Sequence, residues 1–335
     1  MFKFDLQLFA TTTITTNMVQ KAWAKDLMKE AAKEDFFAKF KGTTSGAIIQ
    51  VKTELKKDKG DKITIPLVMQ LTGDGISGDS TLEGNEEKLT FMDMAVTVNQ
   101  IRNAVRLDGN MEEQKTALNL RSAAKDALKE WLVEKIQKDT FASLTGTPTA
   151  NRIVYGGSAT SVGALTTTDT FTANLISVAR RKALKASPKF KPVKVDGKEY
   201  FVMIIDSYQA RDLKNDAKWL DAQKFAANRG SDNPIFTGML GIYDGVVLHE
   251  HDDVVATLDG ASGIRVGHAL LLGCQAGIEG IAQETSWHEK GFDYDNQVGF
   301  STGMIYGIAK SVFTPSGGAA ADFATIQVAT AAIAD

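Results

Sequence analysis

Two histidines and two aspartates stand together in the segment HEHDD, where His249, His251, Asp252 and Asp253 follow a run of apolar residues. Alternate side chains of a strand point to the same side, so both imidazoles could face one metal ion. A catalytic zinc usually takes a third protein ligand, and the spacing differs from that of the helical two-histidine metalloproteases. The segment therefore favours a polar strand end, and a metal-dependent hydrolase using His249 and His251 is kept as an alternative.

Three glycines, Gly73, Gly75 and Gly78, have the spacing of a dinucleotide-binding loop. Such a loop must open a helix whose amino terminus meets the pyrophosphate. The residues that follow, DSTLEGNEEKLTF, are polar and strand-like, and Asp74 and Asp79 would repel phosphate. The spacing therefore predicts a flexible hairpin tip and no bound cofactor.

The remaining reactive side chains have no evident partners in the sequence. Cys274 is the single cysteine and is flanked by apolar residues, so we expect it to pack as a small hydrophobe. His268 and His288 lack a nucleophile nearby, and the run with Asp293 and Asp295 lacks the glycine and glutamate of a calcium loop, which favours a solvated turn. We predict no catalytic, cofactor-binding or metal-binding residue and no enzyme activity.

Composition excludes several classes of protein. The chain has 335 residues, of which 43% are apolar and 24% charged, so it can bury a core and is not a disordered protein. Its 38 Lys and Arg against 41 Asp and Glu leave a formal charge of -3, which argues against high-affinity binding of nucleic acid. No stretch approaches the roughly 18 apolar residues of a membrane span. We expect a soluble protein in a reducing compartment.

The first third of the chain contains segments without a core of their own. Residues 1–17 combine an amphipathic decapeptide with TTTITTN and predict an extended arm, and 18–41 has the apolar spacing of an amphipathic helix. Residues 52–108 hold two strand-like runs, 63–71 and 89–98, which flank a tip rich in Gly and acidic residues. This pattern predicts one long hairpin. An isolated hairpin is marginal in water, so we expect its support to come from another molecule or another part of the same assembly.

The rest of the chain has the pattern of a mixed α/β protein. Residues 111–144 form an uninterrupted helical stripe that predicts a rod of roughly 45 Å. Residues 146–170, rich in Gly, Ser and Thr, predict a linker at a domain boundary, and the tail from 317 to 335 is polar to weakly apolar. The other expected elements are helices at 172–186 and from 207 to 215, and strands at 200–205, 242–249, 269–275 and 304–313.

This order of segments, together with four sequence blocks, resembles the major capsid proteins of tailed phages. The blocks are FDLQLFA at 4–10, YFVMIIDSYQARDLKND, NPIFTGMLGIYDGVVLHEH and HALLLGCQAGIEG. The chain is similar to the family typified by the N-four coliphage, which has the fold first seen in the Hong Kong 97 phage. The resemblance extends from about residue 4 to residue 313.

The resemblance implies an α+β fold of the Hong Kong 97 phage type with five parts. Residues 1–45 would be the N-terminal arm and its helix, 46–110 the extension-loop hairpin, and 111–168 the spine helix and peripheral domain. Residues 169–285 would form the axial domain, and 286–335 would supply the return strands of the peripheral domain and the C-terminal tail.

The implied function is that of a structural major capsid protein. Such proteins assemble as hexamers and pentamers into the icosahedral head that encloses double-stranded DNA, with a portal protein and, in some members, scaffold and decoration proteins. The location would be the virion, and the host cytoplasm during assembly. The slight negative charge agrees with weak, non-specific contact with packaged DNA. The hairpin and arm would contact neighbouring copies and bury Ile63, Ile65, Leu67 and Phe91 there. An encapsulin-like shell around a cargo enzyme is a further alternative.

Overall fold

The computed structural model describes residues 35–56, 60–69, 71, 73–111, 120–224, 238–314 and 319–334. The predicted arm at 1–17 and most of the predicted helix at 18–41 lie outside the described residues. The described part of that helix, η1 (Phe36–Phe40), is a 3-10 helix. The chain divides into two compact units, one built from 100–134 and 283–305 and the other from 36–99, 135–282 and 306–335. Each unit is described by itself below.

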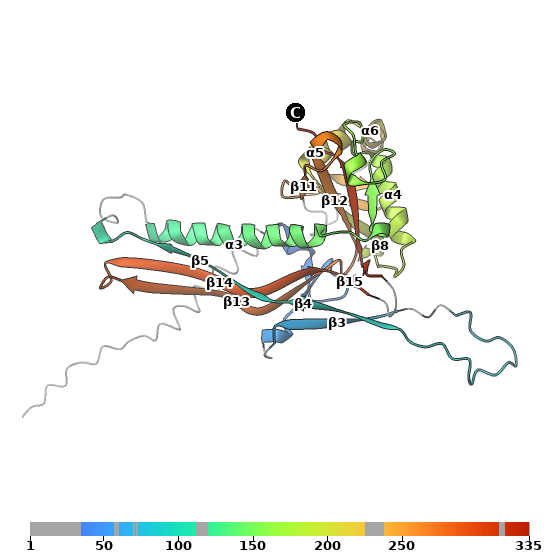
Figure 1. The fold of residues 1–335 in the computed structure, drawn as a ribbon, viewed down its shortest axis with the longest axis horizontal. Helices are drawn as coiled ribbons and strands as arrows, with labels where there is room; N and C mark the ends of the chain where they lie inside the picture. Colours follow the sequence, from blue (N-terminus) through green and yellow to red (C-terminus); the bar gives the residue numbers. More distant parts are fainter. Residues whose placement is uncertain are drawn as a thin grey trace, which may run out of the picture. The chain divides into compact units, whose positions relative to one another are not determined.

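In the first unit a long helix packs against three neighbouring strands of a sheet. Helix α3 (Leu120–Thr145) runs along strands β13 (Gly277–Phe292) and β14 (Gln297–Lys310), with β5 (Asn99–Arg106) next to β14 (Figure 1). Ala124 and Leu128, one helical turn apart, pack against the rings of Trp287 and Phe300, whose centroids are 5.7 Å apart. The apolar side chains that recur along one face of α3 thus contact one face of β13 and β14. Only alternate residues of each strand take part, because the side chains of a strand alternate between its two faces. The helix predicted at 111–144 is confirmed from residue 120 onward.

The second unit contains a mixed eight-stranded sheet. The strands lie in the order β6-β17-β12-β8-β10-β9, with β7 beside β8 and β11 beside β12. Three central strands, β8, β12 and β17, are mostly or wholly buried, as expected for strands with neighbours on both edges. The strand bounds are β6 (Ile153–Tyr155), β7 (Val193–Val195), β8 (Lys198–Ile205), β9 (Gly241–Tyr243), β10 (Val246–Glu250), β11 (Ala256–Thr257), β12 (Val266–Leu272) and β17 (Thr325–Ala331).

Among its described residues, the second unit contains α4 (Ala173–Leu184), α5 (Ser207–Lys214) and α6 (Ala217–Lys224), together with the last part of α3. The start of α5 is set by Asp206, whose side chain accepts a hydrogen bond from the backbone N–H of Tyr208, while Gln209 accepts from the N–H of Asp206. This reciprocal arrangement satisfies donors that a helix start leaves unpaired. The sequence DSYQ contains this capping signal, and the helices predicted at 172–186 and from 207 to 215 are confirmed.

One prediction for the second unit is wrong, and two segments hold strands that the sequence analysis does not predict. The single strand expected at 242–249 is two antiparallel strands, β9 and β10, joined by a turn at Asp244 and Gly245, both with positive φ. The weakly apolar tail contains β17, a completely buried strand between β12 and β6. The sequence TIQVATA does not indicate a buried strand. Its small Thr and Ala side chains fit between two packed layers but do not raise the hydropathy of the segment. The predicted linker at 146–170 also supplies a strand, β6.

The hairpin predicted within 52–108 is confirmed as β3 (Lys62–Val68) and β4 (Phe91–Thr97), paired antiparallel with Val68 opposite Phe91. One face of this ribbon is buried against the chain's own apolar core, so the expectation that Ile63 and Ile65 are buried by a neighbouring copy is wrong. Leu67 is half-buried against the same core, whereas Phe91 is 61% exposed. The physical reason is the period of two, which places Ile63 and Ile65 on the face opposite to Phe91.

Short elements complete the described chain. Strand β2 (Ile49–Lys52) pairs with the start of β13 in parallel and with β1 (Lys41–Gly42), and β15 (Val312–Phe313) pairs with β16 (Ala321–Asp322). The strand predicted at 304–313 is therefore the end of β14 followed by β15. Within the described ranges, no helix has both the length and the apolar character needed to cross a membrane.

Candidate assembly surfaces

The loop between β3 and β4 extends beyond the last strand hydrogen bond, from the N–H of Met69 to the carbonyl of Thr90 at 3.0 Å (Figure 1). Gly75 and Gly78 in this loop have φ near +70°, and a side chain at either position would meet open space. No helix follows these glycines before β4. The prediction that their spacing marks a hairpin tip is therefore confirmed.

The outer part of the ribbon carries the largest group of uncovered apolar side chains in the described chain. Five of the ten exposed large apolar side chains belong to it, and each is 51 to 62% exposed. The loop from 71 to 90 also has five acidic residues against Lys88, a net charge of -4. Exposed apolar side chains that gather on one segment in this way mark a surface that another molecule covers. We call this the ribbon surface; its apolar members are Val68, Leu71, Leu82, Leu89 and Phe91, and its acidic members are Asp74, Asp79, Glu83, Glu86 and Glu87.

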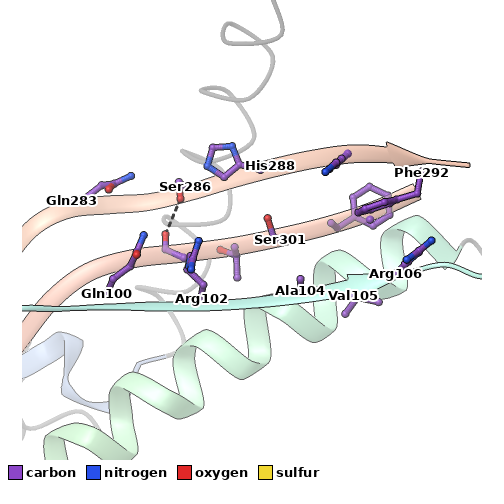
Figure 2. Close-up of a pocket in the computed structure, with 15 residues that line it drawn as sticks. Gln100, Arg102, Ala104, Val105, Arg106, Gln283, Ser286, His288, Phe292 and Ser301 are labelled. Carbon is purple, nitrogen blue, oxygen red and sulfur yellow. Dashed lines mark hydrogen bonds between the residues drawn. The ribbon is translucent and has the colours of Figure 1, made fainter. Parts of the chain in front are cut away.

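A second surface lies in the first unit, on the face of the strands that does not pack against α3. It forms a groove of about 520 Å³ that Figure 2 shows from close range. Arg102 and Arg106 come from β5. His288 and Lys290 come from β13, one and three positions after Trp287, and therefore lie on the other side of that strand. We call the groove lined by these four residues the cationic face, after Arg102, Arg106 and Lys290.

Two cations of the cationic face lie against the same aromatic ring, and no acidic side chain lines the groove. The guanidinium of Arg106 lies 4.3 Å from the ring centroid of Phe292, and the ammonium of Lys290 lies 5.0 Å from it. Arg106 also donates to the side-chain oxygen of Gln297. No acidic residue lines the groove. Sequence analysis missed this surface, although basic residues four apart in β5 and His288 and Lys290 two apart in β13 were the signal that could have found it.

The structure places both histidines of HEHDD among aromatic rings. His249 in β10 is fully buried, with Nδ1 3.2 Å from the ammonium of Lys39. Nδ1 of His251 accepts a hydrogen bond from the N–H of Asp253, and its ring centroid is 4.5 Å from that of Phe36. Both imidazoles lie against Phe36, as the alternation of a strand predicts. Among the described residues, no three His, Cys, Asp or Glu side chains are placed to share a metal ion.

The other residues singled out from the sequence have local contacts. Cys274 is buried, its thiol donates to the carbonyls of Gly46 and Pro192, and burial raises its pKa, so it packs as expected. Burial lowers the pKa of His268, which lies 2.8 Å from the hydroxyl of Thr257. Residues 293–296 form the turn between β13 and β14, which confirms the predicted turn.

The burial of Lys39 leads to a pH prediction. Burial lowers the pKa of Lys39 from 10.5 to about 8. Between these values the unfolded chain binds the proton and the folded chain has released it, so stability rises with pH through this window. We expect the urea midpoint of the protein to rise, relative to that of Lys39→Met, between pH 7.5 and pH 9.5. Parallel changes in the two proteins would contradict the prediction.

Comparison with known proteins identifies the family. A model of the family described as phage capsid protein matches residues 11–334. The chain belongs to this phage capsid protein family. A curated major capsid protein of Pseudomonas phage KPP25 is 32% identical over 362 residues, covering 95% of this chain and 96% of the relative.

Solved capsid structures share the fold of this capsid protein. The capsid of Ralstonia phage GP4 matches with a TM-score of 0.82 and 32% identity, covering 90% of this chain and 92% of that one. The capsid of cyanophage Pam1 matches with a TM-score of 0.75 and 25% identity, covering 89% and 92%. The predicted Hong Kong 97 phage-type fold and the predicted structural role in the head of a tailed phage are confirmed. The hydrolase and cargo-compartment alternatives are not favoured.

Proposed function

We propose that copies of this capsid protein assemble as hexamers and pentamers into an icosahedral head enclosing double-stranded DNA, and that the ribbon surface lies across a neighbouring copy. The observation that carries this proposal is the group of uncovered apolar side chains beyond β3 and β4. Fully burying one such side chain contributes about 1.5–3 kcal/mol, and closed symmetry repeats the contact around the shell. Electron microscopy of the expressed protein tests it, with closed shells or capsomers expected and a stable monomer under all salt conditions contradicting it.

The same proposal includes the finer partners and domain roles. Residues 46–110 act as the extension loop, 111–168 as spine helix and peripheral domain, 169–285 as axial domain, and 1–45 as an arm that reaches other copies. A portal protein, and possible scaffold and decoration proteins, complete the head. DNA is held by weak non-specific contact, in keeping with the charge of -3. Assembly takes place in the host cytoplasm and the product is the virion. The role is structural rather than enzymatic.

Charge complementarity points to the cationic face of a second copy as the surface that receives the ribbon. The loop from 71 to 90 has a net charge of -4, and the groove of the first unit is lined by Arg102, Arg106, His288 and Lys290 without an acidic residue. Opposite potentials steer association and suppress wrong registers. Because both partners are exposed, salt screens their attraction over a Debye length of about 10 Å at 0.1 M.

A charge swap checks this contact. We expect Glu83→Lys with Glu86→Lys, or Arg102→Glu with Lys290→Glu, to raise the concentration needed for assembly about tenfold, because like charges then face each other. The combined fourfold variant is expected to recover assembly, since the attraction is restored with reversed sign. Light scattering across a concentration series measures the threshold. Lys198→Glu with Lys218→Glu, two exposed lysines outside both surfaces, is the control. Failure of the combined variant to exceed either pair would overturn the assignment.

A further inference from the structure

A pocket of about 760 Å³ in the second unit has cationic side chains as its only charged lining. Arg152 comes from the segment that follows α3, whereas Arg181 and Lys182 lie in the last turn of α4 and Lys185 follows that helix. The other lining residues are neutral, and they are Thr149, Asn151, Ala186, Ser187 and the alanines at 319–321. Neither the apolar core nor the two assembly surfaces accounts for this concentration of positive charge.

The deepest cation, Arg152, is 3% exposed and is held by carbonyl groups rather than by a carboxylate. Its Nε donates to the carbonyl of Asp322 at 3.0 Å, and its Nη2 donates to the carbonyl of Ser187 at 2.9 Å. The side chain of Asp322 attracts Arg152 at longer range but forms its ion pair with Lys310, at 3.0 Å. One carboxylate therefore stands beside two buried cations, and the guanidinium keeps an uncompensated charge.

Lys182 adds a second half-buried charge next to Arg152. Its ammonium donates to the carbonyl of Ile153 at 2.7 Å, and its pKa is lowered by burial and by repulsion from Arg152. Repulsion between neighbouring cations in a region of low dielectric is relieved when an anion enters. The electrostatic potential in this pocket therefore favours the binding of a negatively charged group.

Arg181 and Lys185 lie on the exposed rim, four residues apart in sequence and so on one side of α4 and its end. Within the described part of the chain, neither forms an ion pair with a carboxylate. The dipole of α4 favours cations near its last turn, but this does not explain Arg152, which comes from another segment. Two exposed cations thus lie at the rim of the pocket, and two cations that are hydrogen-bonded to carbonyl groups lie inside it.

We propose that this pocket binds phosphate groups. A phosphate presents several charged oxygen acceptors at once, and Arg and Lys are the side chains that recognise it. A chain with a net charge of -3 repels polyanions at long range, so the pocket acts only on a phosphate that has already come close. The phosphate can come from a nucleic-acid backbone or from a small free phosphate compound.

Binding measurements on the full-length assembled protein separate these sources. Inorganic pyrophosphate is titrated by calorimetry, and a 20-base-pair DNA duplex labelled with a fluorophore is followed by anisotropy, both at low salt. We expect Arg181→Ala with Lys185→Ala to weaken binding of the recognised probe at least tenfold. Lys198→Ala with Lys218→Ala removes the same charge from exposed positions elsewhere and should change binding less than twofold.

Each outcome decides the proposal. Binding of duplex alone that is lost in the rim variant supports a phosphodiester ligand, and binding of pyrophosphate with the same loss supports a small phosphate ligand. Equal losses in the rim and control variants, or no binding of either probe by the unmodified protein, would overturn it. Shell formation by both variants, checked by electron microscopy, keeps this result separate from the proposed assembly contacts.

Discussion

Deleting residues 73–86 from the ribbon tip is expected to leave a folded protein that no longer forms shells. None of these residues is buried, and their described contacts are local, such as the 2.8 Å hydrogen bond from the N–H of Gly73 to Glu87. The strand pairs from Lys62 opposite Thr97 to Val68 opposite Phe91 stay in place. The deletion therefore removes an intermolecular surface and hardly any of the intramolecular core.

Two measurements check this expectation. When both proteins are measured as unassembled subunits, the thermal midpoint should change by no more than about 2 °C, because the free-energy change is well below the 1 kcal/mol that shifts a domain of this size by about 2–4 °C. Sedimentation should show capsomers or monomers in place of megadalton particles. A matched pair of point variants refines the test. Leu82→Ala with Leu89→Ala should weaken assembly, whereas Leu220→Ala with Leu258→Ala, also exposed but outside the ribbon surface, should not. Normal shells from the deleted protein would contradict the role of the ribbon.

Asp322→Asn is expected to destabilise the second unit by about 3–5 kcal/mol, the usual effect of removing one partner of a buried ion pair. The side chain of Asp322 is 2% exposed, and it accepts from the ammonium of Lys310 at 3.0 Å and from the N–H of Thr149 at 3.1 Å. The amide keeps the shape but leaves Lys310 with an uncompensated charge, and it removes the carboxylate that attracts Arg152.

An exposed ion pair provides the control for this variant. Arg180 and Asp244 lie 3.2 Å apart with side chains 35% and 39% exposed, so Asp244→Asn should cost no more than about 1 kcal/mol. Urea unfolding of both variants measures the two free energies of unfolding. Similar effects in the two variants would show that Asp322 is not an essential buried charge. The double variant Lys310→Met with Asp322→Leu should be more stable than Asp322→Asn, because Lys310 is then no longer an unpaired buried charge.

The ribbon shows where sequence and structure agree and where they part. The alternation in KITIPLV and FMDMAVT was enough to predict two strands and a polar tip, because a period of two is local information. The alternation did not show which face of the hairpin packs against the chain's own core. Ile63 and Ile65 are buried by residues distant in sequence, and Phe91 is left exposed, so only the folded chain distinguishes a core face from an assembly face.

The rest of the chain likewise divides into features that the sequence predicted and features that only the tertiary structure showed. The order of the segments identified a capsid protein and predicted its long helix, its hairpin and its buried Cys274, since each depends on local pattern or on resemblance of whole blocks. Strand β17, the cationic face and the pocket around Arg152 came only from the tertiary structure. Their residues are individually unremarkable Thr, Ala, Arg and Lys, and their properties arise when pairing and packing bring distant segments together, which a single sequence does not encode as a local signal.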